Sequence, residues 1–256
     1  MNGEKSSETK RILLKLSGES IMGDKFFGID HQSCQKVAVI LQALQCHGME
    51  TGVVIGGGNI LRGQSSCEFG FERIPADHIG MLATCINGLA LCQALSQLGE
   101  KKVRVVSARN FDGIIEPYNW QQTNFYLAKG VIVIFVGGSG NPFFTTDTSA
   151  ALRASEINAK LLIKATKVDG IYNKDPGKFR DAQKFDFLSY DEALHLDLPC
   201  MDGTAISLCR SNNIDILFTA LSKESILSAA INEEGGTLVS KNSCRNKQQR
   251  HKKGEK

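Results

Sequence analysis

The sequence lacks any apolar run long enough to cross a membrane. Its longest strongly apolar run, residues 131–136, is six residues, whereas a membrane helix needs about 20. The first ten residues are polar and contain no apolar segment of the signal-peptide kind. These absences predict a cytoplasmic protein with no membrane partner.

The cysteine and histidine patterns that mark metal and redox sites are also lacking. The eight cysteines form no C-x-x-C pair, and the five histidines show no zinc-type spacing. We therefore interpret the cysteines as reduced thiols of a packed core. A catalytic cysteine would need a histidine partner in the fold, which the sequence alone does not place.

Excess positive charge is confined to the C-terminal residues. The formal net charge is +3, yet residues 241–256 contain seven Lys/Arg and one acid, which leaves 23 basic and 26 acidic residues in the rest. We interpret 241–256 as a solvated, disordered tail rather than an RNA or membrane contact, and we expect no nucleic-acid partner. The expected organisation is a polar segment 1–10, a single domain 11–240 and the tail.

Apolar strand-like segments alternate with segments of helical periodicity along the chain. Strands are predicted over residues 11–17, 53–55, 103–106, 131–136, 160–165, 214–218 and 237–239. Helices are predicted over residues 30–46, 77–98, 146–158, 202–212 and 223–231. This alternation is typical of an α/β fold with a mostly parallel central sheet and helices on both faces.

Four glycine-bearing segments follow predicted strands: residues 15–18, 56–59, 137–147 and 164–170. Ligands of open parallel sheets bind beyond the carboxyl ends of the strands. Glycine lets the backbone N–H groups approach a ligand, and a following helix offers its N-terminus to an anion. Lys15 and Arg62 add full positive charges, while Asp147 and Asp169 are carboxylates that suit Mg²⁺.

Each of these signals is weak alone. Glycine triplets occur in many strand-to-helix turns, Lys15 could be an ordinary strand residue, and Asp147 could be only a helix cap. A P-loop motif is absent, and neither G-x-G segment is followed by the third glycine of a dinucleotide fingerprint. The combination favours a phosphoryl-transfer enzyme that binds phosphate with glycine-rich strand ends.

Five segments carry a resemblance to a known family: residues 11–19, 52–59, 77–84, 140–147 and 164–172. They resemble the amino-acid-kinase superfamily, and within it the bacterial uridylate (UMP) kinases, over about residues 11–240. The most distinctive string is Asn141-Pro142-Phe143-Phe144-Thr145-Thr146-Asp147. The resemblance implies a three-layer sandwich that transfers the γ-phosphoryl group of ATP reversibly to UMP, giving UDP and ADP for pyrimidine nucleotide and CTP biosynthesis. It further implies Mg²⁺ with ATP, a homohexamer, and UTP as a candidate inhibitor.

The resemblance also assigns roles to individual residues. Catalysis is assigned to Lys15, Arg62, Asp147 and Asp202. ATP binding is assigned to Lys15, Leu16, Ser17, Gly18, Gly58, Arg62, Thr166, Tyr172 and Asp175. UMP binding is assigned to Gly57, Asp77, Ser139, Gly140, Asn141, Pro142, Phe143, Phe144, Thr145 and Thr146.

Some of these roles have simpler alternatives. Tyr172 could be a packed aromatic at a loop base, and Asp202 could be a helix cap. Asp147 and Asp202 would organise either the metal or the lysines around the phosphoryl group, so the metal ligands stay open.

In the family's GTP-activated members, basic residues on the helix after Asp77 help to form the effector site. Residues 88–97 contain none, which predicts weak or absent GTP activation.

The chemistry agrees with a phosphate acceptor. A phosphate monoester with a second pKa near 6 is mostly dianionic at pH 7, so it needs no general base. The barrier is repulsion between polyanions, which cations and backbone N–H groups relieve. Two alternatives stay open: a carboxylate kinase of the same superfamily, acting for example on acetylglutamate, and a non-catalytic nucleotide-binding protein on this fold.

Overall fold

The computed structural model of the chain describes residues 10–61, 70–196 and 200–241. The predictions for the segment before residue 10, for Arg62 and for the tail after residue 241 lie outside these described residues.

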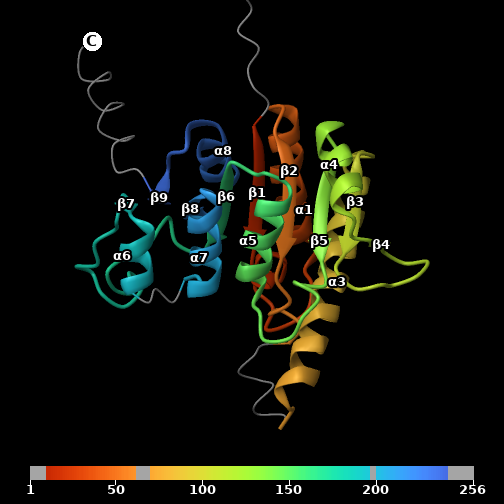
Figure 1. Cartoon of the computed structure of the whole chain (residues 1–256), viewed down its shortest axis with the longest axis horizontal. Coiled ribbons are helices and arrows are strands. Elements are labelled where there is room, and N and C mark those ends of the chain that lie inside the picture. Colours follow the sequence, from red (N-terminus) through yellow and green to blue (C-terminus); the bar gives the residue numbers. More distant parts are fainter. Residues whose placement is uncertain (1–9, 62–69, 197–199, 242–256) are drawn as a thin grey trace, which may run out of the picture.

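The described residues form a single mixed sheet with helices on both faces (Figure 1). The strands are β1 (Arg11–Leu16), β2 (Glu50–Ile55), β3 (Val103–Ser107), β4 (Glu116–Pro117), β5 (Ile132–Val136), β6 (Leu161–Thr166), β7 (Phe187–Leu188), β8 (Asp215–Ala220) and β9 (Gly236–Val239). The helices are η1 (Gly18–Ile21), α1 (His31–Cys46), α3 (Arg73–Gln97), α4 (Trp120–Ala128), α5 (Thr146–Glu156), α6 (Tyr190–His195), α7 (Gly203–Asn212) and α8 (Lys223–Asn232).

The strand order is β4-β3-β5-β2-β1-β6-β8-β9-β7, and every pair is parallel except β8 with β9. The prediction of a mostly parallel sheet is therefore confirmed. Strand β1 lies in the middle, between β2 and β6, so the chain builds one half of the sheet and then returns across β1 to build the other. Ligands of open α/β sheets bind where the strand order reverses in this way.

Alternating strand residues pack into two separate hydrophobic cores, one on each face of the sheet. One core packs Leu14 and Leu16 of β1 against α1, α3 and α8. The other packs Leu13 of β1 against residues of α4, α5, α6 and α7. The period of two along a strand therefore places Lys15 on the same face as Leu13, the face covered by α5.

Most elements begin and end close to the predicted positions. Asp30 caps α1, because its side chain accepts a hydrogen bond from the Ser33 N–H at 2.8 Å, and Gly48 follows with a φ of 74°. Helix α3 begins four residues before the predicted start. The sequence does not predict helix α4, because its buried residues are only Thr123 and Leu127, which gives too little apolar periodicity.

Helix α3 is long and apolar enough to pass a length and hydropathy test for a membrane span, although 44% of its most apolar window is buried inside the fold. Its buried residues all lie from Met81 onward, where it packs against α1 and the sheet, whereas its first turns extend beyond them (Figure 1). Its remaining face is apolar and exposed at Leu82, Ile86 and Leu89.

Candidate active site

Three charged side chains meet at the carboxyl ends of the two central strands. Lys15 of β1 and Lys164 of β6 are direct partners in the parallel register. Asp147, in the first turn of α5, lies between them. Its Oδ1 is 2.7 Å from Lys15 Nζ, and its Oδ2 accepts a hydrogen bond from Lys164 Nζ. All three side chains are nearly buried, and with both lysines protonated the cluster carries one net positive charge.

Burial and mutual proximity shift the pKa values of Asp147 and Lys164 in this cluster. Burial alone would raise the pKa of Asp147, but the adjacent Lys15 and Lys164 lower the pKa below its ordinary value of 3.8. Burial and the like charge of Lys15 lower the pKa of Lys164 below its ordinary value of 10.5. Asp147 is therefore an anion at neutral pH and serves to hold two like charges at one place.

The helix-cap alternative for Asp147 is not what the structure shows. Thr145 is the N-cap of α5, and its hydroxyl accepts hydrogen bonds from the N–H groups of Asp147 at 3.0 Å and Thr148 at 3.4 Å. The carboxylate of Asp147 is thus free to face the lysines. Its position in the first turn also suits the helix dipole.

Asp202 has the cap role that sequence analysis left open. Its Oδ1 accepts the Ala205 N–H at 2.9 Å at the start of α7. The same carboxylate accepts the hydroxyls of Thr145 at 2.5 Å and Thr148 at 2.9 Å. Asp202 therefore ties the start of α5 to α7, which holds the Asp147 turn in place.

The glycine-rich strand ends pack directly on one another. A Cβ on Gly18 would lie 2.3 Å from Asn59 Oδ1 and 2.9 Å from both Gly56 O and Gly58 N. Asn59 cannot easily move, because it forms a buried reciprocal amide pair with Asn87 of α3. A Cβ on Gly58, by contrast, would meet no atom within 4 Å. The ends of β1 and β2 are thereby locked together, and the backbone at Gly58 faces open space.

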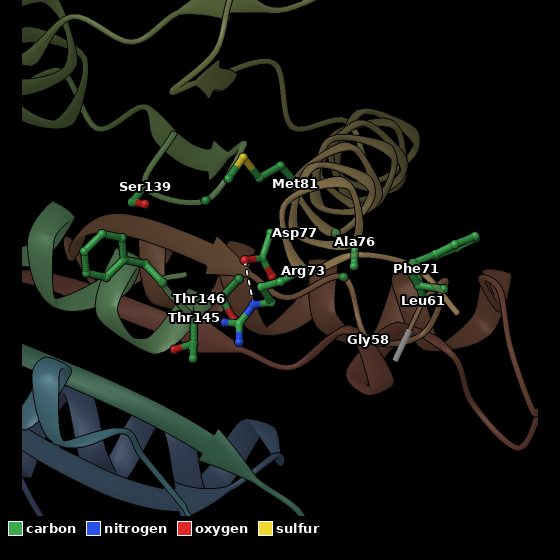
Figure 2. Close-up of a pocket in the computed structure, with 14 residues that line it drawn as sticks. Gly58, Leu61, Phe71, Arg73, Ala76, Asp77, Met81, Ser139, Thr145 and Thr146 are labelled. Atoms are coloured by element: carbon green, nitrogen blue, oxygen red, sulfur yellow. Dashed lines mark hydrogen bonds and ion pairs between the residues drawn. The ribbon is translucent and has the colours of Figure 1, made fainter. Parts of the chain in front are cut away.

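A cavity of about 550 Å³ opens next to these strand ends (Figure 2). It is lined from the turn after β2 by Gly57 and Gly58, and from α3 by Asp77 and Met81. The loop after β5 and the start of α5 complete it with Gly138, Ser139, Phe144, Thr145 and Thr146. The structure therefore brings together six residues predicted to bind UMP: Gly57, Asp77, Ser139, Phe144, Thr145 and Thr146.

The rest of the predicted string lies in the loop that forms the rim of this cavity. Gly140 is buried against Ala108 with a φ of 85°, where a side chain would be strained. The Asn141 N–H and carbonyl both hydrogen-bond the Ser139 hydroxyl at 3.2 Å, and Pro142 is half-buried. The Phe143 N–H donates to Asp77 Oδ2 at 2.7 Å. These four residues shape the loop and are not among those lining the cavity.

A second cavity, of about 440 Å³, lies beyond the end of β6. Tyr172 and Asp175, both predicted to bind ATP, line it together with Pro176, Phe185 and Cys200. The Tyr172 hydroxyl donates to Asp169 Oδ1 at 2.6 Å, and Asp169 also accepts from Lys184 Nζ at 2.8 Å. The packed-aromatic alternative for Tyr172 is thus incomplete, since its ring borders a cavity of the size that ligands occupy.

The charged cluster is linked to a lining residue of each cavity. Thr146 lines the first cavity and immediately precedes Asp147. Cys200 lines the second, and its carbonyl accepts a hydrogen bond from Lys164 Nζ. An anion bridging the two cavities would therefore pass over the positive charge of Lys15 and Lys164.

A resident metal fits this site poorly. Among the described residues, no group of three or more His, Cys, Asp or Glu side chains is close enough to hold an ion. Asp147, the buried carboxylate of the site, already faces a lysine with each oxygen, and its Oδ1 has no hydrogen bond beyond that ion pair. A cluster with two cations and one anion suits a phosphate rather than a bare cation.

Some predicted residues lie elsewhere or differ in use. Leu16 has a fully buried side chain, so only its backbone faces the strand end, and its carbonyl accepts the Gly56 N–H at 2.9 Å. Ser17 is the N-cap of η1, and Thr166 donates to the Val168 carbonyl at 2.5 Å.

Lys164 belongs to the site although the sequence predicts no role for it. A lysine inside the apolar strand of residues 161–165 was the signal, because a buried lysine needs a partner.

The chain is similar to known proteins in both sequence and fold. A model of the amino acid kinase family matches residues 10–220, well over half of the chain. The chain belongs to the amino acid kinase family. A curated relative, the uridylate kinase of Protochlamydia amoebophila (strain UWE25), is 55% identical over 211 residues, which cover 82% of this chain and 84% of the relative. The resemblance predicted from the sequence is thereby confirmed.

Solved structures of this family share the fold. The crystal structure of UMP kinase from Bacillus anthracis aligns with a TM-score of 0.87 and 33% identity, covering 91% of this chain and 97% of that one. UMP kinase from Ureaplasma parvum aligns with a TM-score of 0.85 and 34% identity, covering 91% and 99%. The predicted fold, a mostly parallel sheet between two helical layers, is confirmed.

Proposed function

We propose that this protein is a UMP kinase, a nucleoside monophosphate kinase that transfers the γ-phosphoryl group of ATP to UMP and releases ADP and UDP. The observation that carries the proposal is the Lys15–Asp147–Lys164 cluster, which is linked through Thr146 and Cys200 to two cavities of ligand size. The relative named uridylate kinase and the aligned UMP kinase structures support the choice of acceptor.

The acceptor nucleotide occupies the cavity between β2, α3 and the loop after β5. Asp77 meets its sugar hydroxyls, the backbone at Gly57 receives its phosphate, and Gly58 lies between this phosphate and that of ATP. Ser139, Phe144, Thr145 and Thr146 enclose its base. ATP occupies the second cavity, with its base beside Tyr172 and its sugar beside Asp175. Arg62, outside the described residues, keeps its proposed place between the two phosphates.

Catalysis on this proposal is charge neutralisation. The terminal phosphoryl group of ATP lies over Lys15 and Lys164, whose ammonium groups stabilise the charge on its equatorial oxygens. Asp147 keeps both ammonium groups aimed at that place, and Asp202 holds the turn that carries Asp147. The dianionic acceptor phosphate attacks in line and has no proton to lose, so no side chain acts as a base.

The remaining functional expectations are proposals of the same kind. Mg²⁺ enters as the complex with ATP, held by phosphate oxygens and water, since the described residues offer no cage for it. The reaction places the protein in pyrimidine nucleotide and CTP biosynthesis in the cytoplasm. UTP, which shares the uridine and the phosphate of the acceptor, is a candidate inhibitor.

Self-association is proposed through α3. Between Asp77 and Glu100 this helix and its end contain no Asp, Glu, Lys or Arg. Leu82, Ile86 and Leu89, spaced by four and three residues, are 48%, 50% and 38% exposed. An apolar helical stripe of this kind is covered when two copies pack together, which supports a homohexamer assembled from such pairs.

A panel of acceptors tests the proposed function. The purified protein is incubated with Mg-ATP and, separately, with UMP, CMP, dTMP or acetylglutamate, and ADP release is followed. We expect turnover with UMP at least tenfold faster than with any other acceptor. Turnover only with acetylglutamate would indicate the carboxylate-kinase alternative, and nucleotide binding without any turnover would indicate the non-catalytic one.

A further inference from the structure

Arg73 lies at a position where a positive charge contributes little to the stability of its own helix. It is the first residue of α3, and the N-terminus of a helix carries roughly half a unit of positive charge. The first turn contains no acid, and Glu72 at the N-cap makes no capping bond with its side chain. Arg73 also precedes its partner Asp77, the weaker order for an i, i+4 pair, and its side chain is 60% exposed. Helix stability therefore does not explain this residue.

Arg73 is itself one of the residues that line the acceptor cavity, and its contacts link two other parts of the cavity wall. Its Nε donates to Asp77 Oδ2 at 2.8 Å, the bond drawn in the centre of Figure 2. The Phe143 N–H donates to the same oxygen at 2.7 Å. The Arg73 guanidinium then lies over the Phe143 ring, 5.4 Å from its centroid. One oxygen of Asp77 thus joins α3 to the loop after β5.

These contacts hold two groups that would otherwise move. Phe143 has a φ of 72°, a left-handed conformation that a bulky side chain rarely adopts without support. The Asp77 carboxylate can rotate about its side-chain bonds, and the two donors on Oδ2 fix it. Among the described residues no hydrogen bond reaches Asp77 Oδ1, although Asp77 lines the cavity. The fixed carboxylate therefore offers its second oxygen to a ligand.

We propose that Arg73 is a positioning residue for acceptor selection. It fixes Asp77 through Oδ2, so that Oδ1 accepts a hydrogen bond from the ribose of the acceptor nucleotide. This inference rests on the proposed function. It assigns Arg73 to recognition of the sugar and not of the phosphate.

The test compares UMP with 2′,3′-dideoxyuridine monophosphate, which lacks both sugar hydroxyls. For each acceptor, kcat/KM is measured with wild type, Arg73→Met and Arg73→Lys. We expect Arg73→Met to lower the UMP-to-dideoxy ratio at least fivefold, through a higher KM for UMP, with the KM for ATP unchanged. Arg73→Lys keeps the charge but loses the planar stack on Phe143, so its ratio should be intermediate.

Arg210→Met is the matched control, because Arg210 also pairs with an aspartate, Asp191, at 2.6 Å on the surface. This variant should keep the wild-type ratio. In an Asp77→Asn background, Arg73→Met should change the ratio no further, since both substitutions act on one carboxylate. The melting temperature of Arg73→Met should equal or slightly exceed that of wild type.

Several results would overturn the inference. An equal fall in kcat/KM for both acceptors would mean that Arg73 contacts the phosphate or only supports the fold. An unchanged ratio would mean that Asp77 does not depend on Arg73. If wild type transfers no phosphoryl group to UMP, the proposed function itself fails, a result that is distinct from a defect confined to the Arg73 variants.

Discussion

Lys164 is a single residue on which much of the chemistry depends. It is buried beside Asp147 and is the register partner of Lys15, so its ammonium group lies at the same charged cluster as that of Lys15. Replacing it by methionine keeps the volume and removes one of two charges on the phosphoryl group. We expect Lys164→Met to lower kcat about 10²- to 10³-fold, the range for losing one preorganised donor.

The matched control for this prediction is Lys160→Met, a change at an exposed lysine just before the start of the same strand. It should retain kcat within about twofold in the same steady-state assay. Retention of near-normal kcat by Lys164→Met would show that Lys164 is structural and does not act on the phosphoryl group.

At the residue scale, the sequence predicted the glycines, Lys15 and Asp147, because each lies at the end of a recognisable strand or in the segment after one. It did not predict the partnership of Lys15 with Lys164, since that depends on the register of β1 and β6, which are far apart in the chain. It also left Arg73 without a role. Nothing in the local pattern shows that Arg73 meets Phe143, which is 70 positions later in the sequence.

At the scale of elements, the contact between the ends of β1 and β2 is the most exacting feature of the fold. Gly18→Ala would place a Cβ 2.3 Å from Asn59 Oδ1, and the Asn59–Asn87 pair prevents Asn59 from moving freely. We expect this variant to lose about 2 kcal/mol of unfolding free energy, a cost typical of overpacking. Urea unfolding followed by circular dichroism measures it.

Gly58→Ala provides the comparison, because a Cβ there would meet no atom within 4 Å and the backbone φ is not positive. Its unfolding free energy should stay within about 0.5 kcal/mol of wild type. Equal stability of the two variants would mean that the strand ends are not packed as the structure has them.

Elements with clear signals were predicted well, and elements without them were not. Helix α1 has an aspartate cap, apolar periodicity and a terminal glycine, and its observed bounds match the prediction. Strands β4 and β7 have two residues each, too few for periodicity to appear. The start of α3 was placed too late because Glu72, its N-cap, is not a residue type that favours caps.

At the scale of the whole molecule, the exposed apolar face of α3 predicts assembly. Ile86→Asp puts a charge in the middle of that face, 50% exposed in one subunit and desolvated where two copies pack. We expect light scattering after size exclusion to give a hexamer for wild type and a smaller species for Ile86→Asp. Ile114→Asp, a change at an apolar residue that is 70% exposed outside α3, should leave the mass unchanged. A monomeric wild type would contradict the proposed assembly.

The strand order explains why residues scattered along the chain form one site. Strands β2 and β6 flank β1, and β5 lies beside β2, so the four glycine-bearing ends share one edge of the sheet. One sheet spans residues 11–239, which supports the proposal that residues 11–240 form a single domain. The alternation of strands and helices predicted the layers, but the order of the strands required the structure, because several orders satisfy the same alternation.

The central claim is that Lys15 and Lys164 drive transfer to UMP by charge, without a general base. A single-turnover measurement of UDP formation by chemical quench, from pH 5.5 to pH 10, tests it most directly. The rate should rise as the UMP phosphate loses its second proton near pH 6 and then stay level. At higher pH the rate should fall as Lys164 loses its proton. Because burial lowers the pKa of Lys164, this fall should occur at a pH lower than 10.5, the ordinary pKa of a lysine. Absence of UDP, or a rate that keeps rising about tenfold per pH unit above pH 7 as an ionising base would require, would contradict the account.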